Sequence, residues 1–184
     1  MRRRHPSLTE CLPDVWLVSD ERNDARLERI LRRLPRGSGL IFRHYHLGPE
    51  ARRARFDALA QVARAHGHAV LLAGSAREAR QWRASGCYCT PEAGSSLRSQ
   101  GLLLRLLTAH SLREIGMAQR TRADAILLSP VFPTRSHPGA STLGSVRFRL
   151  LARHSRLPVI ALGGMNRHRA CSLRWKKWAA IDGI

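Results

Sequence analysis

Side chains that bind phosphate are concentrated in one proline-rich stretch, residues 129–139. Thr134 and Ser136 carry hydroxyls that donate hydrogen bonds, and Arg135 carries a guanidinium, which binds phosphate oxygens two at a time. The three prolines of this stretch lower the entropy cost of ordering it. The sequence therefore predicts an anion-binding loop here.

A second anion-binding feature is the pair Gly163-Gly164, which follows an apolar run and precedes a predicted helix. Glycine lets the backbone approach a ligand closely, and the start of a helix attracts anions. A tight turn is the alternative interpretation of this pair. If the two stretches follow neighbouring strands, we expect them to hold one phosphate between them.

The histidines suggest either proton transfer or metal binding. His110 lies at a strand-to-helix junction, where it either hydrogen-bonds the local backbone or moves protons near neutral pH. His44 and His46 have the spacing of one strand face, and His66 and His68 repeat it. Because no third ligand is evident for either pair, we expect packing or solvated histidines and no metal site.

Cys11, Cys87, Cys89 and Cys171 are scattered along the chain, which favours reduced thiols and a cytoplasmic protein. The basic start, residues 1–6, is not followed by an apolar stretch, so we expect no secretory signal. No apolar run approaches the roughly 20 residues that span a bilayer, so no membrane partner is expected.

Thirty-two basic residues against 13 acidic ones give a formal charge of +19. Nearly all of this charge is arginine and it is spread over every segment, so nucleic acid is not the favoured partner. Trp175 and Trp178 are expected to pack rather than to stack on bases. Arginine binds phosphate through paired hydrogen bonds, so a phosphorylated small molecule is the partner that the composition favours.

Short apolar runs alternate with helical patterns along the whole chain. The predicted strands are residues 15–18, 40–43, 69–74, 87–89, 102–107, 125–128, 158–162 and 179–181. The predicted helix starts are a cap at Asp24, a proline at Pro49, a capping box of Ser111 with Glu114, and a cap at Asn166.

Eight such units predict a single α/β domain over residues 1–184, a (β/α)8 TIM barrel with its sites at the carboxyl ends of the strands. An open doubly wound sheet is the alternative. The sequence stops at Ile184, so the eighth strand has no predicted helix after it. We expect either a second copy of the chain to cover that flank, in a homodimer, or the barrel to be open there.

Four segments resemble thiamine phosphate synthase and its relative thiazole tautomerase, with matching order and spacing from Trp16 onward. They are Trp16-Leu17-Val18-Ser19-Asp20, Thr108-Ala109-His110-Ser111-Leu112, Ser129-Pro130-Val131-Phe132-Pro133-Thr134 and Val159-Ile160-Ala161-Leu162-Gly163-Gly164-Met165. The resemblance implies a (β/α)8 barrel. It also implies a magnesium-dependent enzyme that joins a pyrimidine pyrophosphate to a thiazole phosphate and releases pyrophosphate.

By resemblance, Thr134, Ser136 and Gly164 stand where the family holds the thiazole phosphate. Thr108 stands for a serine beside the pyrophosphate. Arg43 keeps an arginine of the family's second strand, which should turn toward the mouth together with the side chains at positions 41 and 45.

Other family positions have lost their polar groups. Ile41 replaces a glutamine, Tyr45 a lysine, and Ala73-Gly74 an Asn-Asp pair that includes a magnesium ligand. The second magnesium aspartate falls near Ala93, where Glu92 is the nearest carboxylate. The resemblance thus implies Mg²⁺ as cofactor, while most of its ligands are missing from the sequence.

Two further replacements lie beside the predicted phosphate site. His137 replaces the family's lysine after the phosphate loop, and Asp182 replaces a serine near the thiazole phosphate. A carboxylate at that place would repel phosphate.

Three functions follow as expectations. The first is a divergent synthase in which Arg43 and His137 hold pyrophosphate. The second is a metal-free, tautomerase-like enzyme in which His110 or His137 moves protons. The third is a non-catalytic barrel that binds a phosphorylated ligand.

Overall fold

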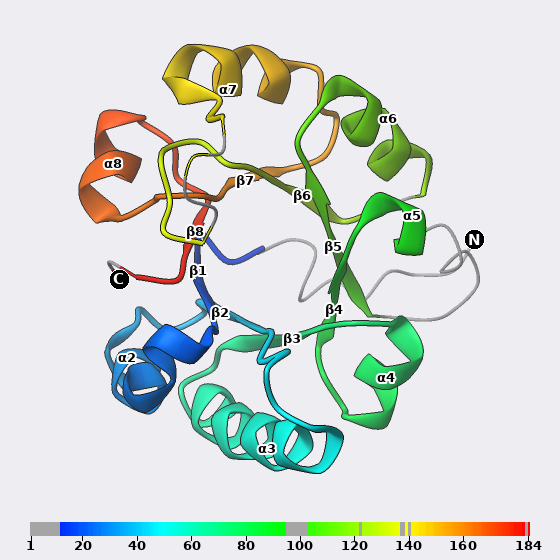
Figure 1. Ribbon diagram of the computed structural model, residues 1–184, viewed down its shortest axis with the longest axis vertical. Helices are drawn as coiled ribbons and strands as arrows, with labels where there is room; N and C mark the ends of the chain where they lie inside the picture. The colour runs from blue at the N-terminus through cyan, green and yellow to red at the C-terminus, as the bar shows by residue number, and fades with distance from the viewer. Residues whose placement is uncertain (1–11, 95–102, 122, 137–138, 140, 183) are drawn as a thin grey trace.

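The computed structural model describes residues 12–94, 103–121, 123–136, 139, 141–182 and 184. Eight parallel strands pair in chain order, and the last pairs with the first, so the sheet is a closed barrel (Figure 1). The predicted (β/α)8 fold is confirmed and the open sheet is excluded. The strands are β1 (Val15–Val18), β2 (Gly39–Phe42), β3 (Ala69–Ala73), β4 (Gly86–Cys89), β5 (Leu104–Ala109), β6 (Ala125–Leu128), β7 (Val159–Ala161) and β8 (Trp178–Ala180).

Helices follow seven of the eight strands and form a ring outside the barrel (Figure 1). They are η1 (Glu21–Arg26), α2 (Leu27–Arg33), α3 (Pro49–Ala65), α4 (Ala76–Gln81), α5 (Pro91–Gly94), α6 (Leu112–Arg120), α7 (Gly144–Arg153) and α8 (Arg167–Ser172). Within the described residues no helix follows β8, so the ring is interrupted between α8 and α2 although the sheet itself closes.

The strands are apolar on both faces because each separates two cores. One cluster fills the barrel interior, and its members include Trp16, Ile41, Leu71, Leu106, Leu127 and Ile160. Two outer clusters pack between the sheet and the helices. The Trp16 ring lies over Gly39, where a Cβ would come within 2.1 Å of the ring, so only glycine fits at that position.

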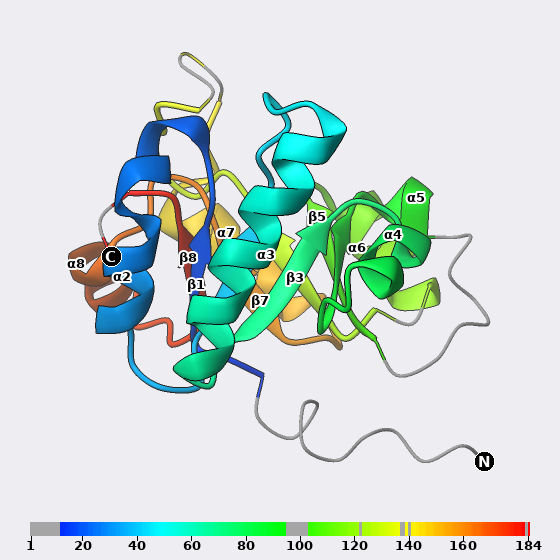
Figure 2. The same cartoon turned by 90° about the horizontal axis from the view of Figure 1, so that it is seen from below.

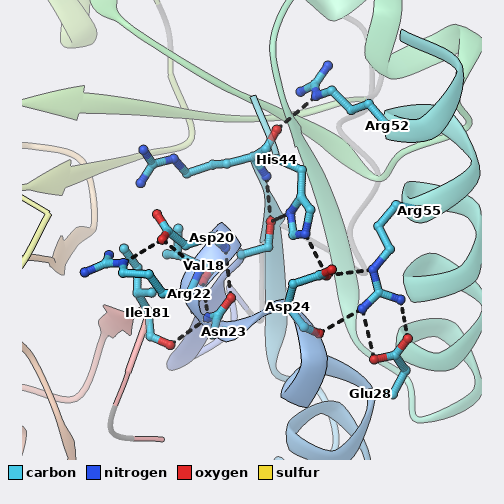
Figure 3. Close-up of polar contacts among 12 residues, drawn as sticks. Val18, Asp20, Arg22, Asn23, Asp24, Glu28, His44, Arg52, Arg55 and Ile181 are labelled. Carbon is cyan, nitrogen blue, oxygen red and sulfur yellow. Dashed lines mark hydrogen bonds and ion pairs between the residues drawn. The ribbon is translucent and has the colours of Figure 1, made fainter. Parts of the chain in front are cut away.

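The closure of the barrel is reinforced by a buried amide that the sequence reasoning missed. The Asn23 side chain donates hydrogen bonds to the carbonyl oxygens of Val18 at 3.0 Å and Ile181 at 2.7 Å. Val18 is the last residue of β1 and Ile181 directly follows β8, so the amide joins the first and last strands at their carboxyl ends (Figure 3).

The helix caps are partly as predicted. The side chains of Ser111 and Asn166 accept hydrogen bonds from the third helical N–H groups of α6 and α8, as expected. The Glu114 carboxylate accepts from the N–H of His110 rather than from that of Ser111, so the predicted capping box is only half formed. The cap predicted at Asp24 is wrong: Asp20 caps η1, and Asp24 lies inside that helix.

Strands β2, β3, β4, β7 and β8 differ from their predicted bounds by one residue at one or both ends, and two segments differ by more. Residues 91–94 form α5, a helix whose start was not among those predicted; Pro91 favours a first helical turn. Strand β5 begins and ends two residues later than predicted, which places Thr108 inside it. In the side view of Figure 2, the loops that follow β2 and β6 rise from the same end of the barrel, the carboxyl ends of the strands.

Candidate functional site

The predicted site residues lie around one cavity of about 1300 Å³ at the carboxyl ends of the strands. Seven of the eight line it: Arg43, Thr108, His110, Thr134, Ser136, Gly163 and Gly164. The eighth, His137, lies outside the described residues. The structure thus brings together residues from β5 and from the loops after β2, β5, β6 and β7.

The loops after β6 and β7 are joined by backbone hydrogen bonds that continue the sheet beyond the strand ends. The N–H of Val131 donates to the carbonyl of Leu162 at 2.9 Å, and that of Phe132 to Gly163 at 3.0 Å. The two predicted anion-binding stretches therefore form one surface of the cavity.

Both glycines of the predicted pair are required by this contact. Gly163 has φ +93°, and a Cβ there would lie 2.6 Å from the Cα of Pro130. Gly164 has φ +60°, and its Cβ would lie 2.4 Å from the carbonyl oxygen of Pro133. The positive φ angles and the close approach of the β6 loop together exclude larger side chains.

The segment that carries the Thr134 and Ser136 hydroxyls is held by Arg22, an arginine that was not predicted from the sequence. Arg22 donates from Nη2 to Ser136 Oγ at 2.8 Å and from Nε to Asp20 Oδ1 at 2.7 Å. The Ser136 N–H in turn donates to Thr134 Oγ1 at 3.3 Å. A guanidinium and two hydroxyls are thereby fixed side by side (Figure 3 shows Arg22 and Asp20).

The ionisation of Asp20 keeps this arrangement in place. Partial burial by itself would raise the pKa of Asp20, but hydrogen bonds and charge from Arg22 outweigh it and the pKa is lowered. The only sequence signal for Arg22 is its position two residues after Asp20, at the end of a strand.

A second missed arginine, Arg169 of α8, lines the cavity beside the glycine pair. Its guanidinium donates to the carbonyl of Gly164 and lies over the Phe132 ring, with Cζ 5.1 Å from the ring centroid. Arg135 also lines the cavity. The β6–β7 side of the mouth is therefore strongly cationic.

His110 hydrogen-bonds the backbone, as the simpler interpretation of this residue expected. Its Nδ1 lies 2.6 Å from the carbonyl oxygen of Ser129, and its Nε2 lies 3.3 Å from Thr108 Oγ1. A carbonyl can only accept, so Nδ1 carries a proton, and Nε2 is the ring nitrogen that faces Thr108 at the cavity. In the tautomer with the proton on Nδ1, Nε2 is the atom that can accept a proton.

On the opposite side of the mouth, Arg43 and Tyr45 line the cavity together, with Arg43 Cζ 5.7 Å from the Tyr45 ring centroid. Ile41, which was expected to turn toward the mouth with them, is fully buried in the barrel interior. The Ile41 side chain lies one layer of side chains below the mouth, so it packs in the core beneath the cavity and does not line the cavity.

Arg52 of α3 fixes the backbone behind Arg43. It donates to the carbonyls of Arg43 at 2.9 Å and Ala73 at 2.7 Å, and it forms an ion pair with Glu78 at 3.0 Å. Its side chain is only 12% exposed. A buried guanidinium thus joins the ends of β2 and β3 (Figure 3 shows Arg52).

His44 belongs to a buried chain of hydrogen bonds and not to a metal site. The ring donates from Nε2 to Asp24 at 2.7 Å and accepts at Nδ1 from Ser19 Oγ at 2.8 Å (Figure 3). The Ser19 oxygen accepts from the N–H of Arg43 at 2.8 Å. Burial is the main cause that lowers the pKa of His44, so the ring is neutral at pH 7.

The strand face predicted for His44 and His46 is wrong, because β2 ends at Phe42 and His44 has φ +40°. His68 is buried and its Nε2 bonds the Leu31 carbonyl, which is a packing role. No group of three His, Cys, Asp or Glu side chains suitable for a metal occurs among the described residues.

The described cysteines and the two tryptophans follow the simpler expectations, while Cys11 lies outside the described residues. Cys87, Cys89 and Cys171 are free thiols. Trp175 donates to the carbonyl of Val159 at 2.9 Å, and its ring packs edge-on against Phe148. Trp178 is buried in β8. In the described part of the chain, no helix is long and apolar enough to cross a membrane.

The residues around the cavity do not fit magnesium. Among the described lining residues, Asp182 is the only carboxylate, against four arginines. Magnesium is bound through carboxylate and other oxygen ligands, usually with several waters. Ala73, Gly74 and Ala93, where the family resemblance implies metal ligands, bring no carboxylate to the lining.

Asp182 is partly neutralised by an arginine outside the cavity. Arg26 Nη2 lies 3.5 Å from Asp182 Oδ1, and both side chains are about half exposed. The pair is too exposed to be strong. It nevertheless reduces the repulsion that this carboxylate would exert on a nearby phosphate.

A closed (β/α)8 barrel with a cationic cavity at the carboxyl ends of its strands defines the class of this protein. The chain belongs to the thiamine monophosphate synthase family, whose model matches residues 15–184.

Curated relatives agree with this assignment, and a solved structure shares the fold. Thiamine-phosphate synthase of Chloroflexus aurantiacus is 33% identical over 79 residues, which are 42% of this chain and 35% of the relative. A candidate thiamine-phosphate synthase of Aquifex aeolicus is 41% identical over 58 residues, 32% of this chain and 31% of the relative. The matched segments therefore span about a third of these relatives. Thiamine phosphate pyrophosphorylase from Pyrococcus furiosus has the same fold, with TM-score 0.75, 20% identity, and 94% and 87% of the two chains covered.

Proposed function

We propose that the cavity binds a phosphorylated small molecule, with its phosphate between the loops after β6 and β7. The observation that carries this proposal is the convergence of the Thr134 and Ser136 hydroxyls, the Gly164 backbone and the Arg22 guanidinium on one surface. Hydroxyls and backbone N–H groups donate to phosphate oxygens, and arginine adds charge and paired hydrogen bonds.

Family membership supports a thiazole phosphate as this ligand and thiamine biosynthesis as the context. We infer a thiamine phosphate synthase-type transfer, in which a pyrimidine pyrophosphate is joined to the thiazole phosphate. The bond to the pyrophosphate oxygen breaks, and pyrophosphate leaves with the electron pair. The free thiols support a reducing, cytoplasmic setting.

The negative charge that develops on the leaving pyrophosphate must be stabilised in the cavity. Arg43 and Arg135 line it, and His137 follows in sequence outside the described residues. Ser19 and Arg52 hold the backbone of Arg43 on both sides, through its N–H and its carbonyl. We therefore propose that guanidinium groups stabilise the charge on the leaving pyrophosphate, a role that the family resemblance assigns to magnesium.

The test is turnover of the two substrates, pyrimidine pyrophosphate and thiazole phosphate, to thiamine phosphate. We expect product with the unaltered protein and at least a tenfold loss of kcat/KM in Thr134→Val, which removes one hydroxyl with little change of shape. Thr121→Val is the matched control, because that hydroxyl donates to the Ala118 carbonyl on the outer helix α6. No product at high protein concentration would rule out the transfer.

A second candidate is metal-free proton transfer of the tautomerase kind, favoured by the fixed proton of His110 Nδ1 and by the position of Nε2 in the cavity beside Thr108 Oγ1. Incubating a thiazole phosphate with the protein in D₂O should then exchange carbon-bound hydrogen for deuterium. His110→Gln should abolish the exchange, and His154→Gln, at the end of α7, should not. Thiazole phosphate binding with neither transfer nor exchange would indicate a non-catalytic binding barrel.

A further inference from the structure

A buried network of Ser19, His44 and Asp24 ends at the backbone of Arg43, next to the mouth (Figure 3 shows His44 and Asp24). The Arg43 N–H donates to Ser19 Oγ at 2.8 Å, and the Ser19 hydroxyl donates to His44 Nδ1 at 2.8 Å. The ring then donates from Nε2 to Asp24 Oδ1 at 2.7 Å. Ser19 is 0% exposed and His44 1%, so water does not compete for these bonds.

The far end of this network is fixed by Arg55 of α3 (Figure 3). Arg55 donates from Nε to Asp24 Oδ1 at 2.7 Å and from Nη2 to the Asp24 carbonyl at 2.9 Å, and it also pairs with Glu28 of α2. Partial burial alone would raise the pKa of Asp24, but hydrogen bonds from His44 and Arg55 and the charge of Arg55 outweigh it, and the pKa is lowered. Because a carboxylate can only accept, Asp24 fixes the direction of each hydrogen bond in the network.

Serine, histidine and aspartate joined in this order also form the catalytic triad of hydrolases. The Ser19 oxygen is not available for attack here, because it is buried, accepts from the Arg43 N–H and does not belong to the lining of the cavity. The network therefore supports its neighbours and does not act as a nucleophile.

His44 holds a backbone conformation that is unfavourable for a residue with a Cβ. Its φ is +40°, in the left-handed region. The ring lies parallel to that of Phe42, with centroids 4.8 Å apart, and its two hydrogen bonds hold it there. Arg43 and Tyr45, the neighbours on both sides, line the cavity, while His44 does not. Unfavourable backbone held by surrounding contacts is typical of functional sites.

We propose that His44, together with Ser19 and Asp24, is a positioning residue for Arg43 and sets the affinity of the mouth for pyrophosphate. This inference rests on the proposed function, in which Arg43 binds the leaving pyrophosphate. A guanidinium binds two phosphate oxygens only when its planar group is correctly oriented, so a backbone that shifts loses affinity although the charge remains. Arg52 already holds the Arg43 carbonyl, and Ser19 holds the remaining backbone group, the N–H.

Three variants separate the side chain of His44 from its backbone conformation. Ser19→Ala removes the acceptor of the Arg43 N–H. His44→Gly keeps the positive φ accessible but removes both hydrogen bonds. His44→Asn keeps an oxygen that can accept from Ser19, in a residue type that tolerates left-handed backbone. Ser38→Ala and His68→Asn are the matched controls, because both side chains are buried but lie at the amino ends of β2 and β3, away from the mouth.

The first readout is the affinity for inorganic pyrophosphate, measured by calorimetry in EDTA. We expect Ser19→Ala and His44→Gly to weaken it by about tenfold or more, and His44→Asn by no more than about threefold. The affinity for thiazole phosphate, which is proposed to bind at the loops after β6 and β7, should stay within about twofold in every variant and thereby shows that the mouth is folded. The two controls should leave both affinities unchanged.

The second readout needs no ligand. Hydrogen exchange of the Arg43 amide, followed by NMR, reports directly whether its N–H remains bonded. We expect exchange to be faster by about tenfold or more in Ser19→Ala and His44→Gly, and unchanged in the two controls.

Pyrophosphate affinity that Arg43→Ala lowers but Ser19→Ala and His44→Gly leave unchanged would overturn the proposal, because Arg43 would then bind without this support. A parallel loss of thiazole phosphate affinity, or an equal loss in the controls, would also overturn it, since the effect would then be general destabilisation. Pyrophosphate affinity that Arg43→Ala leaves unchanged would instead contradict the proposed function. The positioning of Arg43 would then be decided by hydrogen exchange, supported by a faster rate and overturned by an unchanged one.

Discussion

Arg22 and Ser136 are 114 positions apart in the chain, yet the guanidinium of Arg22 donates to the hydroxyl of Ser136 at 2.8 Å. The same guanidinium is held by Asp20 at 2.7 Å. The contact links η1, which follows β1, to the loop after β6 at the mouth of the barrel. It therefore places a fixed positive charge beside the proposed phosphate site.

Replacement of Arg22 tests whether that charge serves the ligand. We expect Arg22→Ala to weaken binding of thiazole phosphate by about tenfold to a hundredfold, the range for a lost charged hydrogen bond of roughly 1.5–3 kcal/mol. The melting temperature should hardly change, because the ion pair is partly exposed. Calorimetry and thermal melting measure the two effects. Unchanged affinity would show that Arg22 connects two segments of the mouth and does not bind the ligand.

Gly164 is predicted to be irreplaceable for both backbone and steric reasons. Gly164→Ala combines strain at φ +60° with a contact of 2.4 Å to Pro133, so we expect a loss of stability of about 2–4 kcal/mol and weaker phosphate binding. Gly37→Ala is the matched control: its φ is +78°, but nothing lies within 4 Å of its Cβ.

The control should lose only about 1 kcal/mol and keep its affinity. Urea unfolding gives the stability of each variant, and calorimetry gives the affinity. Equal effects of the two substitutions would mean that the approach of the β6 loop at Gly164 is not tight in solution.

The overall fold could be predicted from the sequence because every strand is a short apolar run separated by a helical pattern. The roles of Thr134 and the glycine pair could also be predicted, because a hydroxyl group and a flexible glycine backbone bind a ligand directly and need no partner from a distant segment. Arg22 and Arg52 could not be placed, because their roles depend on partners in distant segments. In a chain with 32 basic residues, nothing in the sequence distinguishes Arg52 from the others, and Arg22 is marked only by its position two residues after Asp20.

The free energy of unfolding should decrease as the pH is lowered below about 6.5, the ordinary pKa of histidine. Burial lowers the pKa of His44, so the folded chain keeps this ring neutral while the unfolded chain takes up a proton. The stabilisation from the neutral ring is therefore complete above pH 6.5 and is lost as the pH falls through and below it.

Unfolding free energies measured between pH 8 and pH 5 test this expectation. His44→Gln should be less stable at pH 8 and show a shallower dependence on pH than the unaltered chain. His154→Gln, at the exposed end of α7, should keep the full dependence. An unchanged slope in His44→Gln would show that His44 is not the group responsible.

Pyrophosphate binding should depend on arginine and not on magnesium. The affinity measured with magnesium and with EDTA should agree within about threefold, because Asp182 is the only carboxylate among the described lining residues. Arg43→Ala should lower the affinity at least tenfold, while Arg153→Ala, on the outer helix α7, should leave it unchanged. A tenfold or larger gain from magnesium would mean that the ligand itself completes a metal site.

The buried Trp16 ring lies over Gly39 and helps to fill the barrel interior, so the interior does not form a channel. Molecules that enter the mouth cannot leave through the barrel interior, so substrates and products must use the same opening. For the two-substrate reaction proposed above, bound product would therefore compete with incoming substrate at this opening.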